Sequence, residues 1–191
     1  FSLDPESVLA RVQLGMALHR SGAASEARQT FEAAERAFSK SADVLNYFGE
    51  VLVEANEFDL AEVKFRAALD VSDSRYALAH VNLGVLQLHV RQDLDGAVEN
   101  CKRAIAADPL CETAHVHMAH LRMQQFNLKE AVDAYDQAVG LLRLRQELVD
   151  CYAMREAMAV QVALLESDPE TYKPLVEAQR ARAAQMLASQ A

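Results

Sequence analysis

The chain has 191 residues, and its 51% hydrophobic and 25% charged residues are the proportions of an ordinary folded domain, which excludes a disordered or fibrous chain. Only six glycines and four prolines interrupt long stretches rich in Ala, Leu, Glu, Gln and Arg, so we expect helices and no strands. The formal net charge of −9 argues against a nucleic-acid partner, because such binding depends on Lys and Arg displacing counterions from phosphates.

One sequence pattern recurs four times along the chain, with a period of about 34 residues. Each copy begins with an apolar residue followed by a small one. An Ala comes next, then a bulky residue or Cys four positions after that Ala, and finally another Ala. The copies in residues 8–41 and 42–76 carry Leu14-Gly15, Ala27, Phe31, Ala34 and Phe48-Gly49, Ala61, Phe65, Ala68. The copies in residues 77–111 and 112–145 carry Leu83-Gly84, Ala97, Cys101, Ala104 and Met118-Ala119, Ala131, Tyr135, Ala138. We expect each copy to form two helices that approach closely at the small residues.

This pattern resembles the tetratricopeptide repeat (TPR), whose units stack into a right-handed superhelix. It therefore predicts an all-α solenoid that occupies residues 1–191 as a single domain. Two single-residue insertions shift the period, one between Asp70 and Tyr76 and one between Arg91 and Gly96. We expect both insertions to lie in connections between helices, where extra residues are tolerated.

Two further helices are expected after the fourth repeat. Apolar residues recur at helical spacing over residues 146–166, which predicts one helix and resembles a degenerate fifth repeat. Asp168 and Pro169 suit the N-cap and the first turn of a last helix over residues 168–190. Because terminal repeats need a polar outer face, we expect this last helix to cap the solenoid.

The first helix of each repeat has two faces with different expected roles. At 100° per residue, Leu14, Gly15 and Leu18 share the side that faces the second helix. Val12 and Met16 belong to the other side, which stacked repeats place on a concave wall. We expect this wall to be a groove that binds a peptide through apolar anchors and hydrogen bonds, although some of its residues could instead pack against neighbouring helices. The predicted groove residues are Val12, Met16, Asn46, Tyr47, Glu50, Asn82, Val85, His89, His117, His120 and Gln124.

No catalytic residue, metal site or cofactor is expected. His117 and His120 are three positions apart, but no carboxylate or thiol accompanies them at ligand spacing. The motifs of serine hydrolases, phosphate-binding loops and dinucleotide sites are absent. Cys101, Cys111 and Cys151 lack CxxC and Cys-His spacing, so they predict no disulfide framework, and we expect Cys101 to be buried and unreactive. No apolar run reaches the roughly 18 to 20 residues that span a bilayer, so we expect no membrane contact by this stretch.

Several short motifs are more specific than the repeat spacing. They are Val44-Leu45-Asn46-Tyr47-Phe48-Gly49-Glu50, Leu86-Gln87-Leu88, Arg91-Gln92-Asp93-Leu94-Asp95, Lys102-Arg103-Ala104-Ile105, Lys129-Glu130-Ala131, Gln146-Glu147-Leu148 and Ser167-Asp168-Pro169. With them, roughly residues 35–175 resemble the C-terminal region of the large TPR receptor of the mitochondrial outer-membrane translocase. The predicted groove positions lack the clamp of Lys, Asn and Arg with which other TPR domains bind the acidic C-terminus of cytosolic chaperones.

The resemblance implies a function and a location. It implies a mitochondrial import receptor whose groove binds precursor proteins, notably carriers with internal targeting signals, and hands them to other translocase subunits. It also implies a place on the cytosolic face of the mitochondrial outer membrane, with the membrane anchor and a chaperone-docking clamp upstream of this stretch. Leu3-Asp4-Pro5 resembles the closing turn of a preceding repeat, so we expect the chain to be part of a longer protein.

Two other functions remain open on the sequence alone. A non-catalytic scaffold or co-chaperone adaptor would use the same repeats to hold a multiprotein assembly, and its binding would be insensitive to added precursor peptide. An enzyme would require metal-dependent turnover that depends on His117 and His120, and we expect none.

Overall fold

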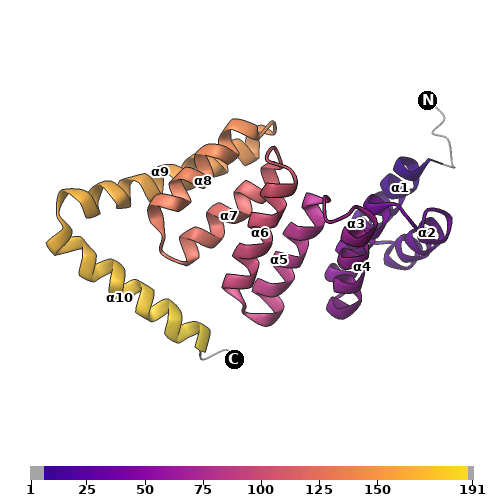
Figure 1. Ribbon diagram of the computed structural model, residues 1–191, viewed down its shortest axis with the longest axis horizontal. Helices are drawn as coiled ribbons and strands as arrows, with labels where there is room; N and C mark the ends of the chain where they lie inside the picture. Colours follow the sequence, from indigo (N-terminus) through magenta and orange to yellow (C-terminus); the bar gives the residue numbers. More distant parts are fainter. Residues whose placement is uncertain (1–6, 189–191) are drawn as a thin grey trace.

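The computed structural model describes residues 7–188, and in this part of the chain it shows ten α-helices and no strand (Figure 1). The first eight helices are α1 (Val8–Arg20), α2 (Ala24–Ala37), α3 (Ala42–Glu54), α4 (Phe58–Val71), α5 (Ala77–Arg91), α6 (Leu94–Ala107), α7 (Glu112–Gln124) and α8 (Leu128–Leu141). Two longer helices follow, α9 (Arg145–Ser167) and α10 (Pro169–Ala188). The predicted all-helical solenoid is confirmed, whereas the turn expected at Leu3-Asp4-Pro5 lies outside the described residues.

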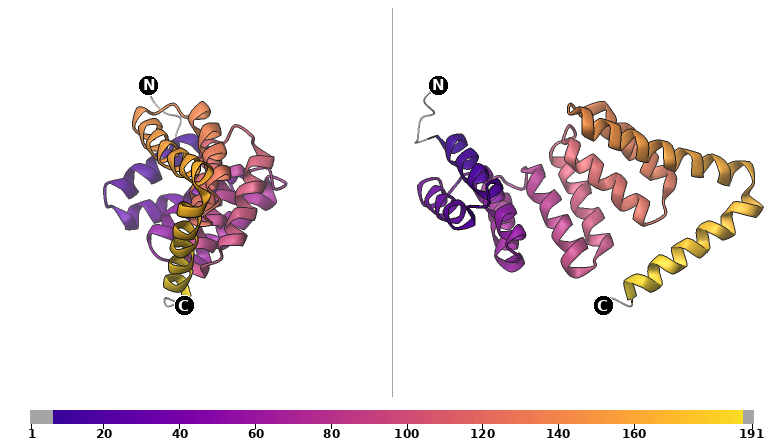
Figure 2. Two further views of the ribbon diagram at one scale, coloured as in Figure 1. Left: turned by 90° about the vertical axis from the view of Figure 1, so that its left-hand side faces the viewer. Right: turned by 180° about the vertical axis from the view of Figure 1, so that it is seen from behind.

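The first eight helices form four pairs that follow one another along the molecule (Figures 1 and 2). Each odd-numbered helix up to α7 packs most extensively against the even-numbered helix that follows it. The odd-numbered helices also contact one another, from α1 to α3, α3 to α5 and α5 to α7. They therefore form a continuous layer, which is the layer that carries the predicted groove residues.

Glycines in the odd-numbered helices make room for aromatic rings. A methyl group at Gly15 would lie 2.5 Å from Cε2 of Phe31, and one at Gly49 would lie 2.4 Å from Cε1 of Phe65. Both rings are fully buried. The close approach predicted from the repeat spacing is therefore confirmed in the first two pairs. Gly84 is less crowded, because Cys101 replaces the aromatic ring of the third pair.

The buried side chains form two large groups. In the first, the rings of Phe31 and Phe48 stack with their centroids 5.7 Å apart. The second includes Cys101, Met118 and the fully buried Tyr135. Burial raises the pKa of Cys101 to about 12, so this thiol stays protonated and unreactive, as expected from the sequence.

The first insertion lies in a connection, as predicted. Five residues, 72–76, join α4 to α5, whereas four residues, 38–41, join α2 to α3. The longer connection makes its turn at Asp73 and Ser74, whose φ angles of 52° and 60° are left-handed. The extra residue therefore changes the turn and leaves both helices intact.

The second insertion was wrongly expected to lie in a connection, because it lengthens α5 instead. This helix continues to Arg91, seven residues past Gly84, whereas α3 ends at Glu54, five residues past Gly49. Two residues then suffice to reach α6. Gln92 takes a left-handed φ of 56°, and Asp93 caps α6 by accepting a hydrogen bond from the backbone N–H of Gly96 at 2.8 Å. These tight-turn residues explain why the insertion moves into the helix.

The last two helices do not pack as a fifth pair. Asp168 separates them and accepts a hydrogen bond from the backbone N–H of Thr171 at 3.2 Å, so the predicted N-cap is confirmed. α9 packs against α8, but α10 diverges from α9 after this turn, as the front and rear views show (Figures 1 and 2). In this arrangement the described side chains of α10 do not cover the fourth pair, and most of them are exposed.

Candidate functional site

The layer of odd-numbered helices places most predicted groove residues at or near the surface. Met16, Tyr47, Glu50, Asn82, Val85, His117 and His120 are partly buried, and His89 and Gln124 are exposed. The prediction that Val12 and Asn46 line an accessible groove is wrong, because their exposed fractions are only 6% and 0%. Val12 joins the hydrophobic core, and Asn46 hydrogen-bonds to α5, so both belong to helix packing and not to an accessible wall.

A hydrogen-bonded network joins α3 to α5. Nδ2 of Asn82 donates to Oδ1 of Asn46 at 3.0 Å and to Oε1 of Glu50 at 3.1 Å, and Nδ2 of Asn46 donates to the same Glu50 oxygen at 2.9 Å. Burial raises the pKa of Glu50, and the two amide hydrogen bonds partly offset this effect. Three predicted groove residues are thus brought together, and their mutual hydrogen bonds fix α3 against α5.

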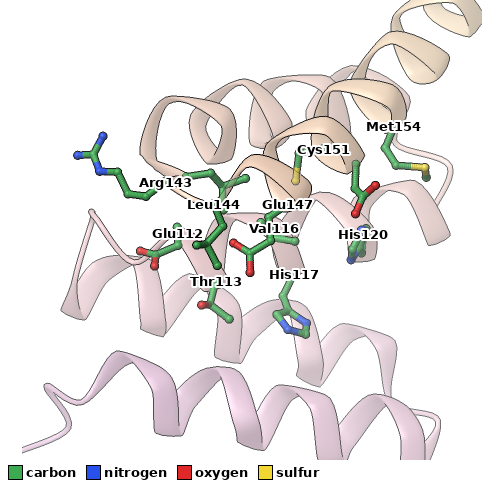
Figure 3. Close-up of a pocket in the computed structure, with 12 residues that line it drawn as sticks. Glu112, Thr113, Val116, His117, His120, Arg143, Leu144, Glu147, Cys151 and Met154 are labelled. Carbon is green, nitrogen blue, oxygen red and sulfur yellow. The ribbon is translucent and has the colours of Figure 1, made fainter.

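A pocket of about 400 Å³ lies between α7 and the first half of α9 (Figure 3). The helix α7 contributes Glu112, Thr113, Val116, His117 and His120. The other lining residues are Leu142, Arg143 and Leu144 at the turn after α8, and Glu147, Asp150, Cys151 and Met154 of α9. Of the eleven predicted groove residues, the pocket therefore brings together only His117 and His120.

The pocket combines an apolar lining with acidic charge. Val116, Leu144 and Met154 supply apolar surface, and Figure 3 shows side chains from both helices converging on the same space. Glu112, Glu147 and Asp150 are exposed carboxylates, whereas Arg143 is the single Lys or Arg among the lining residues. An apolar side chain with a cationic neighbour fits this combination, because the pocket offers burial to the first and opposite charge to the second.

Burial lowers the pKa of both histidines of the pocket. For His117 burial is the largest cause, and the nearby His120 and His89 lower its pKa further. Burial alone lowers the pKa of His120, whose ring meets that of Tyr135 edge-on with centroids 5.8 Å apart. Near neutral pH both rings are therefore uncharged, and they do not neutralise the carboxylates of the pocket.

Acidification is expected to destabilise the fold through His117 and His120. Their pKa values in the folded chain lie below the unfolded value of about 6.5, so the unfolded chain binds protons first. Their contribution to stability is complete above about pH 6.5 and falls as the pH drops through that value toward the folded pKa. Urea unfolding at about pH 7.5 and about pH 5.5 measures this loss, which should shrink in the His117→Gln/His120→Gln variant.

A matched control separates this effect from other titrations. His89→Gln alters an exposed histidine and should keep most of the parent's pH dependence. The raised pKa of Glu50 acts in the opposite direction, but this residue is common to all the proteins compared. A double variant with the same pH dependence as the parent would contradict the prediction.

Metal ligands and reactive thiols are the two kinds of reactive group to consider at this site. The described residues contain no group of three or more His, Cys, Asp and Glu side chains that could hold a metal ion. Burial raises the pKa of Cys151, so the thiol at the pocket is a weak nucleophile.

A helix that spans a membrane must be both long and apolar. Among residues 7–188, no helix combines the length and the apolar character that crossing a bilayer needs.

Sequence reasoning missed the α9 wall of the pocket. The sequence had already indicated a degenerate fifth repeat over residues 146–166, but the groove positions were not carried onto it. The register was available, because Ala153 follows Ala119 by 34 residues and so makes α9 the first helix of that repeat. Its inner positions, which include Asp150 and Met154, then extend the groove. No pattern marked Leu144, since it lies in an irregular turn.

The sequence matches a known repeat family. A family model of the tetratricopeptide repeat matches residues 1–42 and 48–110. The mitochondrial import receptor subunit TOM70 of Homo sapiens is 28% identical over 166 residues, which are 83% of this chain and 27% of that protein. TOM70 of Saccharomyces cerevisiae is 27% identical over 176 residues, which are 87% of this chain and 28% of the yeast protein. The chain thus spans little more than a quarter of the length of these relatives.

Solved structures agree with the family match. The crystal structure of yeast Tom70 has a TM-score of 0.75 and 25% identity, and the match covers 90% of this chain and 37% of that one. A thermophilic TPR protein of Thermus thermophilus has a TM-score of 0.65 at 16% identity, over 94% of this chain and the whole of the other. The second likeness shows a shared fold alone. The resemblance inferred from the sequence motifs is confirmed by the TOM70 matches.

Proposed function

Because this chain belongs to the tetratricopeptide-repeat family, whose stacked helices form binding surfaces for other polypeptides, we propose that it is the precursor-binding part of a mitochondrial import receptor of the TOM70 type. The observation that carries the proposal is the pocket between α7 and α9, with its apolar lining and acidic edge. The similarity to human and yeast TOM70 supports the receptor role.

The pocket suggests how a precursor segment binds. An apolar side chain of the segment inserts between Val116 and Met154 and is removed from water. A neighbouring Lys or Arg approaches Glu147 and Asp150, which attract it and orient the segment. Thr113 adds a hydroxyl that can hydrogen-bond to the segment's backbone. The receptor then acts by holding and releasing the segment, without chemical change.

The proposal includes a location and partners. The protein acts on the cytosolic face of the mitochondrial outer membrane, where it binds carrier-type precursors with internal targeting signals. It passes them to other subunits of the translocase and receives chaperones through a clamp that belongs to other repeats. The similarity to TOM70 supports this assignment, and the net charge of −9 is consistent with attraction of basic segments.

Fluorescence anisotropy with three labelled peptides tests the proposal. They are a hydrophobic carrier segment, the acidic C-terminal tail of a cytosolic chaperone and a scrambled version of the carrier segment. We expect the carrier segment to bind selectively and to weaken as salt is raised, because salt screens the pocket's carboxylates. Binding of none of the peptides would contradict the receptor proposal. A stable complex with one folded protein, unaffected by the carrier segment, would favour the scaffold.

A further inference from the structure

α9 has an apolar stripe on the side that faces away from α8. The stripe consists of Val149, Tyr152, Val160 and Leu164, with exposed fractions of 53%, 49%, 57% and 37%. At 100° per residue these four positions share one side of the helix. The buried Cys151 and Met158 lie about half a turn away, on the side that packs against α8. α9 is therefore apolar on two opposite sides, and among the described residues no helix packs along the second side beyond Leu164.

In each of the four helix pairs from α1 to α8, the odd-numbered helix has a side equivalent to this stripe, and the even-numbered helix that follows covers it. The repeat spacing makes Ala153, at the centre of the stripe, equivalent to Ala119 and to Gly15, Gly49 and Gly84. Those four small residues are buried, whereas Ala153 is exposed. The stripe is thus the surface on which the second helix packs in each other pair, and in the part of the chain that the structure describes no helix covers Ala153.

We propose that the stripe is the docking surface of α10, which closes onto it and completes a fifth helix pair. α10 is the next helix in the chain, is joined to α9 through Asp168 alone, and has 20 residues against the 23 of α9. Near this turn the two helices already share a small cavity lined by Leu164 of α9 and by Tyr172 and Leu175 of α10. Gln161 and Leu165 of α9 also line this cavity, but Leu164 alone belongs to the stripe. Closure therefore carries the contact of α10 from Leu164 along the rest of the stripe.

The sequences of the two helices match in the closed arrangement. In an antiparallel hairpin, residues at equal distances from Asp168 face each other. Leu164 then meets Tyr172, and Val160 meets Val176. The next pair is Glu156 with Arg180, which have opposite charges. Steps of four residues keep each set on one side of its helix.

The polar pair favours closure because neither charge has a strong competing contact. In the described structure, the exposed Glu156 pairs only with its neighbour Arg155, whose guanidinium also binds Asp136. Arg180 makes no ion pair with the described residues. Closure therefore adds an ion pair across the hairpin as well as burying the stripe.

Closure has a consequence for the pocket, although the inference does not depend on the proposed function. Glu147, Asp150 and Met154 lie on α9, so this helix forms one wall of the pocket. α9 in the open arrangement is supported mainly by α8. With α10 docked on the opposite side, α9 is held from both sides and the pocket wall is fixed.

Disulfide formation in the whole chain tests the closed arrangement. The variant carries Val160→Cys with Val176→Cys, and its matched control carries Val160→Cys with Ala178→Cys, because Ala178 lies on the other side of α10. The three native cysteines are buried and are common to both proteins. With oxidised glutathione as the oxidant, we expect an intramolecular disulfide in the variant and none in the control. Equal crosslinking in both proteins, or none in either, would overturn the proposal.

Two further outcomes complete the test. Disulfide-linked dimers that increase with protein concentration would show that a second copy occupies the stripe, which overturns the intramolecular proposal. Glu156→Arg should lower the crosslinked fraction up to about fivefold, as expected for a surface ion pair, and adding Arg180→Glu should restore it. Failure of the charge exchange to restore crosslinking would contradict the proposed register.

Discussion

Replacing Gly49 by alanine is expected to destabilise the fold by about 1–3 kcal/mol, although alanine normally favours a helix over glycine by about 0.5–1 kcal/mol. The added methyl group would lie 2.4, 2.7 and 2.9 Å from three ring atoms of Phe65. These distances are far below ordinary contact, and the ring is fully buried, so it has little space into which to move. The steric cost therefore exceeds the gain in helix propensity.

Gly140→Ala is the matched control for this prediction. Gly140 also lies in a helix, but a methyl group there would meet no atom within 4 Å. This substitution should stabilise the protein through helix propensity, by at most about 0.5–1 kcal/mol because Gly140 lies in the last turn of α8. Urea unfolding of the two variants and the parent measures both effects. Equal stability changes of the same sign would show that the contact between Gly49 and Phe65 is not tight.

Val116→Asp is expected to weaken binding of the carrier segment by about tenfold or more, which corresponds to at least about 1.4 kcal/mol. Val116 lines the pocket, where an aspartate would remove apolar contact surface. The new carboxylate would also be partly buried and close to Glu147 and Asp150, so it would be poorly solvated and repelled. Anisotropy titration with the labelled carrier segment measures the loss.

Val63→Asp supplies the matched control for the binding prediction. It makes the same chemical change at an exposed position of α4, with 57% of the residue exposed, outside the lining of the pocket. This variant should bind like the parent. Circular dichroism must show the same helix content in both variants, because Val116 also packs against the core. Equal loss of binding in the two variants would argue against the pocket as the site.

The helix pairs could be predicted because their determinants are local and repeat at a fixed spacing. Gly49 and Phe65 lie on the two helices of one pair, on either side of a single short connection, and Gly15 and Phe31 have the same separation in sequence. The insertion near Gln92 could not be placed from the sequence, because two arrangements accommodate an extra residue. One is a longer loop, and the other is a longer α5 followed by a tight turn with a left-handed Gln92 and a cap at Asp93; the packing of the two helices decides between them.

The candidate site was predicted only at the level of a face. Helical periodicity put Val12 and His117 on the same face, but the structure buries Val12 in the core and leaves His117 beside a pocket. The difference arises because burial depends on the neighbouring helix as well as on the residue's own helix. Val12 belongs to the core shared by the first helix pairs, whereas His117 lines the pocket between α7 and α9.

The sequence by itself determined the repeat, the pairing of the first eight helices and the N-cap at Asp168, because these follow from contacts between residues close in the chain. Only the tertiary structure decided which residues of the concave face are accessible and where the pocket lies. It also decided that α10 leaves the stripe of α9 uncovered. The physical reason is that these features depend on how successive helix pairs are rotated against one another, which sums many weak side-chain contacts over the whole solenoid.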